Sequence, residues 1–186
     1  MYFQYTDEHL NNLNQDYAVY SVNEEFSSRK KTKQVVEKSN IDPKNETNTI
    51  TTSDGQEFRV VATKSDPVTG FDGLAVAPIV NGEPDYKNVA VIAAGTDPGS
   101  PTKIDVGTAV AERESGLSPQ YYVADRFVNE IMDDPRYEVS QLSGYSQGSY
   151  MLKVGAKYHI PTTTFNAWFF YNSLSNEEKA FIDKNP

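Results

Sequence analysis

Cysteine is absent from this 186-residue chain, and histidine occurs only twice, as His9 and His159. The lack of cysteine excludes disulfides, thiolate catalysis and cysteine-ligated metal centres. No apolar run approaches the roughly 18 residues that span a bilayer, and the first residues lack the basic flank and apolar centre of a signal peptide. We therefore expect no transmembrane segment and no export through such a peptide, and the cellular location stays unknown.

Positive charge is also scarce, because 17 lysines and arginines stand against 26 aspartates and glutamates, a net charge of −9. Such a surface repels a phosphate backbone, and the basic cluster from Arg29 to Lys33 is short, so we expect no nucleic-acid partner. A hydrophobic content of 38% suffices for one core. The length predicts a single domain over residues 1–186, in which the polar residues 21–48 form a connecting segment.

The first half of the chain predicts one helix and four strands. Apolar residues recur at helical spacing over residues 7–20, which indicates a short packing helix. Two β-prone runs, 49–52 and 57–63, flank Asp54-Gly55 and predict a hairpin. Residues 73–79 and 88–93 read as two further strands. The last run is apolar on both faces, which is typical of a central strand covered on both sides.

The second half alternates between strand and helix. We expect helices over 119–132 and 148–157, strands over 137–142 and 161–167, and a last helix that begins with the capping box Ser175 and Glu178. This order is the pattern of parallel crossover units. The predicted fold class is therefore α/β, with a mainly parallel central sheet, antiparallel amino-terminal strands and flanking helices.

The sharpest local motif is Gly144-Tyr145-Ser146-Gln147-Gly148, a G-x-S-x-G sequence between a predicted strand and a predicted helix. This context is that of a nucleophile elbow, in which the serine occupies a strained turn and small residues two positions away avoid clashes. The helix that follows would direct its amino terminus at developing negative charge. The alternative is a glycine-rich strand-to-helix turn whose serine only caps the helix.

An upstream loop fits the same chemistry, because the strand over 88–93 leads into Gly95-Thr96-Asp97. Taken together, the AGTD loop, the G-x-S-x-G elbow and the PTTTFNA run at 161–167 resemble class 3 lipases and their bacterial relatives, some of which are lipase-like domains of secreted antibacterial toxins. The resemblance covers roughly residues 70 to 186 and implies an α/β-hydrolase-like core. It also implies secretion by a route that needs no signal peptide.

Position by position, the resemblance implies that Ser146 is the nucleophile and that the backbone N–H of Gln147 is one oxyanion donor. It implies that Thr96, next to Gly95, supplies the second donor through its N–H and its hydroxyl. Ester hydrolysis of this kind needs no metal and no cofactor.

Three further residues bear on the resemblance. Asp105 lies where relatives carry an aspartate that braces the loop, and a plain loop carboxylate is the equal alternative. Tyr145 and Ser149 replace the histidine and the glycine that relatives place beside the nucleophile. Neither change removes a catalytic group, although both alter the shape of a pocket.

The triad is incomplete in this chain. A helix over 148–157 would carry His159 to the edge opposite Ser146, so we expect it to cap that helix or to begin the next strand. We expect His9 to be an exposed helical residue, and Asp183 to lie on a helix surface. We therefore expect that the chain stops before the strands that would supply the acid and the base.

The resulting hypothesis is a serine ester hydrolase of the lipase or phospholipase type, acting on acyl lipids or similar esters, in a chain that lacks its acid and base. The alternative is a non-catalytic binding module on a hydrolase scaffold. The expected partners are the ester substrate and a missing carboxyl-terminal segment, and the toxin resemblance adds a chaperone or an immunity protein.

Overall fold

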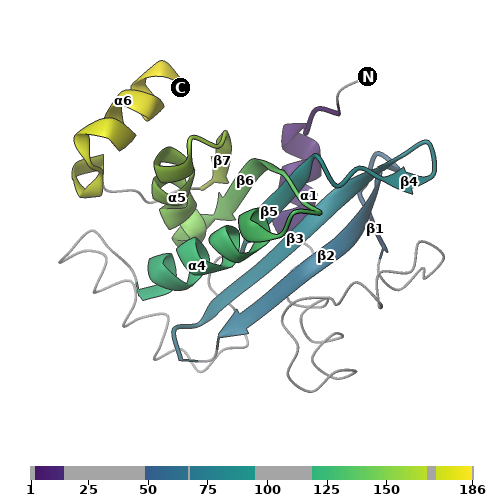
Figure 1. The fold of residues 1–186 in the computed structure, drawn as a ribbon, viewed down its shortest axis with the longest axis horizontal. Coiled ribbons are helices and arrows are strands. Elements are labelled where there is room, and N and C mark those ends of the chain that lie inside the picture. The colour runs from purple at the N-terminus through teal and green to yellow at the C-terminus, as the bar shows by residue number, and fades with distance from the viewer. Residues whose placement is uncertain (1–2, 15–48, 67, 95–118, 167–170, 186) are drawn as a thin grey trace.

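The computed structural model describes residues 3–14, 49–66, 68–94, 119–166 and 171–185. The predicted connecting segment 21–48 and the second half of the predicted first helix lie outside these ranges. The described elements, shown in Figure 1, are α1 (Asp7–Asn14), β1 (Thr49–Thr51), β2 (Glu57–Asp66), β3 (Phe71–Val80), β4 (Glu83–Pro84), β5 (Val89–Ala93), α4 (Pro119–Asp133), β6 (Val139–Tyr145), η3 (Ser146–Tyr150), α5 (Met151–Tyr158), β7 (Thr162–Phe165), η4 (Tyr171–Ser173) and α6 (Asn176–Lys184).

One mixed sheet organises the described residues, in the order β1-β2-β3-β5-β6-β7, with β4 paired to β3. Parallel pairing joins β5 to β6 and β6 to β7, whereas β1, β2, β3 and β5 pair antiparallel. The α/β class is confirmed at this level. The antiparallel pairing of the amino-terminal strands is confirmed. The sheet as a whole is mixed and not mainly parallel, because the ten-residue strands β2 and β3 form a hairpin that supplies the longest pairing in the sheet.

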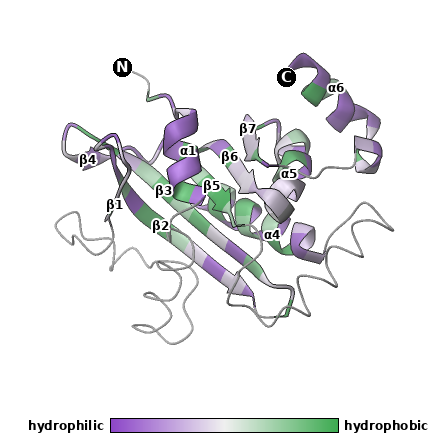
Figure 2. Cartoon of the chain, turned by 180° about the vertical axis from the view of Figure 1, so that it is seen from behind, coloured by the Kyte–Doolittle hydropathy of each residue, from purple (hydrophilic) through white to green (hydrophobic). Residues whose placement is uncertain are grey.

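Both faces of the sheet are covered, and β5 lies in the middle. Every residue of β5 is buried, as its uninterrupted apolar sequence predicts. One face packs against α4 and α5, and the other packs against α1 through Leu10 and Leu13. Figure 2, seen from behind, shows α1 in front of the sheet, and Figure 1 shows α4 and α5 on the opposite side.

The predicted elements are found with shifted ends. The hairpin around Asp54-Gly55, the four early strands and the helix from Pro119 are confirmed, and β6 extends three residues further than expected, to Tyr145. The capping box of Ser175 and Glu178 at the start of α6 is also confirmed. The two-residue strand β4 is not among the predicted strands. Among the described helices, none is long and apolar enough to cross a membrane.

Candidate functional site

Ser146 occupies the sharp turn between β6 and the helical segment η3. Tyr145 is still extended, with φ −119° and ψ 132°, and Ser146 has a φ of 50°. Residues other than glycine rarely adopt a positive φ, and holding one there costs on the order of 1–3 kcal/mol, so the surrounding structure must impose it. The elbow context predicted from the sequence therefore has the backbone strain that such a turn requires.

Close backbone packing around the turn explains both of its glycines. A Cβ atom on Gly144 would lie 2.0 Å from the carbonyl oxygen of Gly148. A Cβ atom on Gly148 would lie 2.9 Å from the carbonyl oxygen of Ala93 and 3.3 Å from that of Ala94. Any side chain at either position would clash with backbone, which is why the turn needs glycine two residues before and two residues after Ser146.

The same contacts place the turn at the edge where the parallel strands end. Ala93, the last residue of β5, pairs with Gly144 of β6, and Gly148 packs against the end of β5. Ser146 therefore lies at the carboxyl edge of the parallel strands, where α/β proteins commonly place ligands. Gly95, Thr96 and Asp105, which belong to the predicted oxyanion loop and its brace, lie outside the described residues.

Gln147 follows Ser146 as the second residue of η3. The first N–H groups of a helical segment have no partner within the helix and are available to an acceptor. The structure thus brings Ser146, Gly144, Gly148 and the backbone of Gln147 together at the end of β5.

A buried chain of polar groups, which the sequence analysis missed, supports the strand below the turn. Ser143 is fully buried, its hydroxyl donates to the carbonyl of Thr163 at 2.8 Å, and it accepts from the side-chain amide of Asn14 at 2.6 Å. The same amide nitrogen donates to the carbonyl of Leu10 at 2.7 Å. These hydrogen bonds link α1 to β6 and β7. Ser143 lies three residues before Ser146 in the sequence. The sequence does contain a signal for this chain of hydrogen bonds, because Ser143 and Asn14 are polar residues at positions that face the apolar core.

His159 caps α5. This is one of the two roles predicted for it, the other being the start of the next strand. It is the residue after the helix, with a left-handed φ of 55°, and its exposed ring stacks on Phe181 with centroids 5.1 Å apart. Its Nε2 lies 3.7 Å from Glu177. Because α5 runs away from the turn, His159 lies at the end of the helix opposite Ser146.

The prediction that His9 is exposed is wrong, because the side chain is buried between two phenylalanine rings. Its ring stacks on Phe3 and meets Phe58 edge-on, and the residue is 5% exposed. Its Nε2 hydrogen-bonds a carboxylate oxygen of Asp54 at 2.6 Å. Thr6 and His9 also exchange hydrogen bonds, since Thr6 N–H donates to Nδ1 and His9 N–H donates to the Thr6 hydroxyl. This reciprocal pair is a capping box with histidine in the place of glutamate.

Strand register places His9 far from the turn. Its neighbour Phe58 pairs with Pro78, two residues beyond the pairing of Val76 with Ala90 near the start of β5. Ser146 lies past the other end of β5. The two positions are separated by the length of that strand, roughly 16 Å for five residues. Both histidines of the chain therefore lie away from Ser146.

Lys153 is the basic residue of α5 that lies nearest in sequence to the turn, and its ammonium group already has an ion-pair partner and a hydrogen-bond acceptor. Its ammonium lies 2.7 Å from a carboxylate oxygen of Glu178 and donates to the carbonyl of Ser173 at 3.1 Å. Both side chains of the ion pair are nearly buried. This arrangement holds the lysine as a structural cation that fastens α6 to α5.

Among the described residues, no group of three or more histidine, aspartate or glutamate side chains is placed to hold a metal ion. No family model, no curated protein and no solved structure matches the chain.

Proposed function

We propose that this chain is an α/β-hydrolase-like serine ester hydrolase, with Ser146 as its nucleophile. One observation carries the proposal: Ser146 has a positive φ on a turn so tight that neither Gly144 nor Gly148 leaves room for a Cβ atom. A serine held in a strained turn between a strand and a helix is what a nucleophile elbow requires, because this turn exposes the serine hydroxyl at the end of the sheet. The location at the carboxyl edge of the parallel strands supports the same reading.

The proposed chemistry is acyl transfer. The Ser146 oxygen attacks the ester carbonyl carbon while its proton passes to a base, and the carbonyl oxygen becomes an oxyanion. The backbone N–H of Gln147, together with Thr96, stabilises that oxyanion. The carbon–oxygen bond to the alcohol then breaks, the alcohol leaves with a proton, and water hydrolyses the acyl-enzyme. Acyl lipids and similar esters are the proposed substrates, on the strength of the class 3 lipase resemblance of the motifs.

The base in this proposal is not a histidine of this chain, because both histidines are placed elsewhere. His9 is held by Asp54 and Thr6, and His159 caps the far end of α5. We therefore expect the isolated chain to turn over p-nitrophenyl esters slowly. Catalysis that rests on binding and oxyanion stabilisation alone still exceeds the uncatalysed rate, by roughly 10³–10⁴-fold in the best-studied serine hydrolase.

Covalent labelling with a fluorophosphonate tests the nucleophile directly. We expect the probe to modify Ser146, as located by mass spectrometry, and Ser146→Ala to abolish the modification. Ser53→Ala, at the exposed β1–β2 turn, is the matched control and should label like the unmodified protein. Added imidazole should accelerate labelling of the protein that retains Ser146 if a missing base limits the reaction.

A second candidate function is a non-catalytic binding module that keeps the hydrolase scaffold. The observation that favours it is the placement of both histidines away from the turn. This alternative predicts that Ser146 is no more reactive toward the fluorophosphonate than other exposed serines, with or without imidazole. That result would overturn the hydrolase proposal.

A further inference from the structure

The strand that ends beside Ser146 is held on both sides within the sheet. Gly144 of β6 pairs with Ala93 of β5 and with Thr164 of β7. These pairings fix the register of β6 against its two neighbours. The orientation of its carboxyl end relative to the helical layers depends instead on contacts that reach it from the two faces of the sheet.

A polar contact reaches the end of β6 from the face that α1 covers. The side-chain nitrogen of Asn14 donates to the Ser143 hydroxyl at 2.6 Å and to the carbonyl of Leu10 at 2.7 Å. A carbonyl oxygen only accepts, so the contact with Leu10 identifies the amide nitrogen as the atom that faces both partners. The Ser143 hydroxyl in turn donates to the carbonyl of Thr163 in β7 at 2.8 Å. Asn14 is thereby connected to both parallel strands three residues before Ser146.

The side chain of Asn14 carries a cost in stability that an apolar residue would avoid. It is 6% exposed, and its Oδ1 is buried without a hydrogen-bond partner among the described residues, which is destabilising. Attachment of α1 to the sheet does not require this amide, because Leu10 and Leu13 already pack into the apolar layer on that face. Hydrophobic contacts have no preferred direction, whereas an amide that donates to two defined acceptors fixes one position of the helix against the strand. The amide therefore specifies position more than it adds stability.

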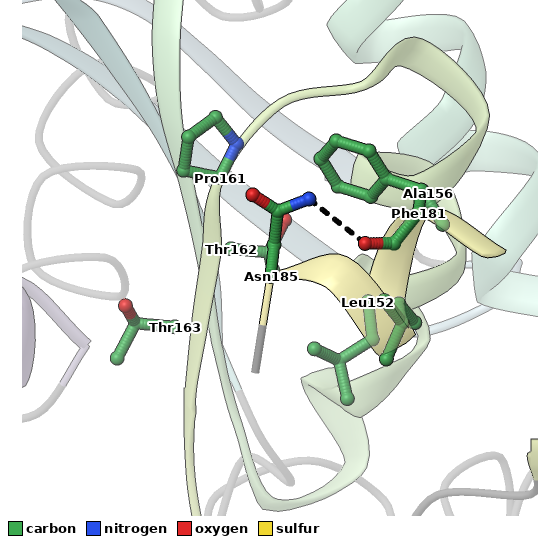
Figure 3. A pocket seen from close by; sticks show the side chains of 8 residues that line it. Leu152, Ala156, Pro161, Thr162, Thr163, Phe181 and Asn185 are labelled. Carbon is green, nitrogen blue, oxygen red and sulfur yellow. Dashed lines mark hydrogen bonds between the residues drawn. The ribbon is translucent and has the colours of Figure 1, made fainter. Parts of the chain in front are cut away.

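The strand β7 depends on such a contact, because its packing on the side of α5 and α6 is incomplete. A cavity of about 400 Å³ lies between β7, α5 and α6 (Figure 3). Figure 3 shows Thr162 on the α6 side of the strand and Thr163 on the other side. All four residues of β7 are half-buried, whereas every residue of β5 is buried. Side chains beside a cavity lack part of their packing contacts, so the hydrogen bond from Ser143 contributes more to the placement of β7 beside the turn.

We propose that Asn14 is a positioning residue for Ser146: through its hydrogen bond to Ser143, α1 sets the orientation in which β6 presents Ser146 to a substrate. This inference rests on the proposed function. Asn14 touches no reacting atom and acts through Ser143 alone. Displacing a reacting group by about 1 Å lowers a rate by roughly 10²-fold, so loss of this hydrogen bond is measurable as reactivity at Ser146.

The decisive experiment compares the second-order rate at which the fluorophosphonate labels Ser146 in the full chain and in Asn14→Leu. This substitution removes the amide and keeps a side chain of similar size. We expect labelling to slow by about 10-fold or more. We expect the urea midpoint of unfolding to stay at the parental value or to rise, because the buried acceptor without a partner is removed. A merely structural role predicts the opposite, a lower midpoint with the labelling rate of the folded protein unchanged.

Asn12→Leu is the matched control, since it makes the same change two residues away in α1. The side-chain oxygen of Asn12 accepts from the N–H of Ser53 at 2.8 Å, at the β1–β2 turn and not at β6. This variant should label at the parental rate. Equal slowing in Asn12→Leu and Asn14→Leu would show a general effect of disturbing α1 and would overturn the proposal.

Ser143→Ala tests the same hydrogen bond from its other end. It should also slow labelling, and combining it with Asn14→Leu should slow labelling no further, because both changes remove one interaction. Circular dichroism checks that each variant is folded, and if Asn14→Leu is not, Ser143→Ala decides. Parental labelling rates in the folded variants refute the positioning role and leave Ser146 as the nucleophile.

A parent chain that does not label at Ser146 overturns the proposed function instead. Amide hydrogen exchange then decides the role of Asn14, because it reports on the turn without any reaction of Ser146. We expect Asn14→Leu to exchange faster than the parent over residues 144–148, and Asn12→Leu to exchange there as the parent does. Unchanged exchange of that turn in Asn14→Leu refutes the inference.

Discussion

Two glycines, on either side of Ser146, decide whether the turn can form. Gly144 and Gly148 approach each other so closely that the backbone of one occupies the space of a side chain on the other. Their role is therefore steric. At Gly82, by contrast, a Cβ atom would meet nothing within 4 Å, and glycine is needed only because the backbone φ is 80°. The difference between the two kinds of glycine can be measured.

Gly144→Ala should destabilise the protein by about 1–3 kcal/mol or more, since the new methyl group overlaps the carbonyl oxygen of Gly148, a backbone atom of η3 that cannot move as a side chain would. Gly82→Ala should cost about 1–2 kcal/mol, the ordinary penalty for a left-handed conformation. Urea unfolding measures both. Ser146 labelling should fall in the first variant and not in the second. Equal losses of stability, with labelling unchanged in both, would contradict the packing argument.

Asp54 is a carboxylate whose pKa is lowered by its hydrogen-bond partners. Hydrogen bonds from the Thr52 hydroxyl and from His9 lower the pKa of Asp54 from 3.8 to about 2, against an opposing effect of partial burial. A carboxylate with a depressed pKa contributes stability that is present above its unfolded value of 3.8 and is lost as the pH falls through about 2.

We expect Asp54→Asn to reduce this acid dependence. The variant should be less stable than the parent at neutral pH, and the difference should shrink as the pH falls from about 4 to about 2. Urea midpoints across that range measure it. Glu83→Gln, an exposed carboxylate on β4, is the control and should keep the acid profile of the parent. A constant difference between Asp54→Asn and the parent at all pH values would contradict the assignment.

At the scale of elements, Glu178 links the amino-terminal cap of α6 to the ion pair that joins α6 to α5. The carboxylate of Glu178 accepts from the N–H of Ser175 at 2.8 Å and from Lys153 at 2.7 Å, and the residue is buried. Capping and attachment to α5 thus depend on the same group. Such a link is local, because it joins α6 to a helix and not to the sheet.

Glu178→Ala should therefore release α6 before the rest of the fold. We expect faster amide hydrogen exchange over residues 171–185 and a global loss of about 1–3 kcal/mol, the range for a buried hydrogen bond to a charged group. Glu178→Gln is the matched variant, because it keeps an acceptor for Ser175 and loses the ion pair, so its effect should be intermediate. Unchanged exchange in both variants would show that α6 is held by its apolar contacts.

Local signals were sufficient for the hairpin at Asp54-Gly55, for the strand-to-helix turn at Ser146 and for the capping box of α6, because neighbours in sequence determine each of them. The burial of His9 depends on Phe58 and Asp54, which are more than forty residues away along the chain. No periodicity near His9 contains that information, and the same holds for the bond between Asn14 and Ser143.

At the scale of the whole molecule, one sheet separates two hydrophobic layers. Leu142 of β6 lies in the layer under α4 and α5, and Leu13 of α1 lies in the layer on the other face. Both side chains are fully buried. Because the strands of the sheet contribute residues to both layers, losing one layer exposes the strands that support the other. We therefore expect the described core to unfold as one cooperative unit.

Leu13→Ala and Leu142→Ala test this expectation with the same chemical change in each layer. Each should lower the free energy of unfolding by about 2–5 kcal/mol, the range for truncation of a buried leucine. In each variant, circular dichroism and tyrosine fluorescence should report a single urea transition with coincident midpoints and an unchanged slope, as two-state unfolding requires. If Leu13→Ala splits the transition, so that the secondary structure persists after one fluorescence change, then α1 and its layer unfold separately and the fold is two units joined at the sheet.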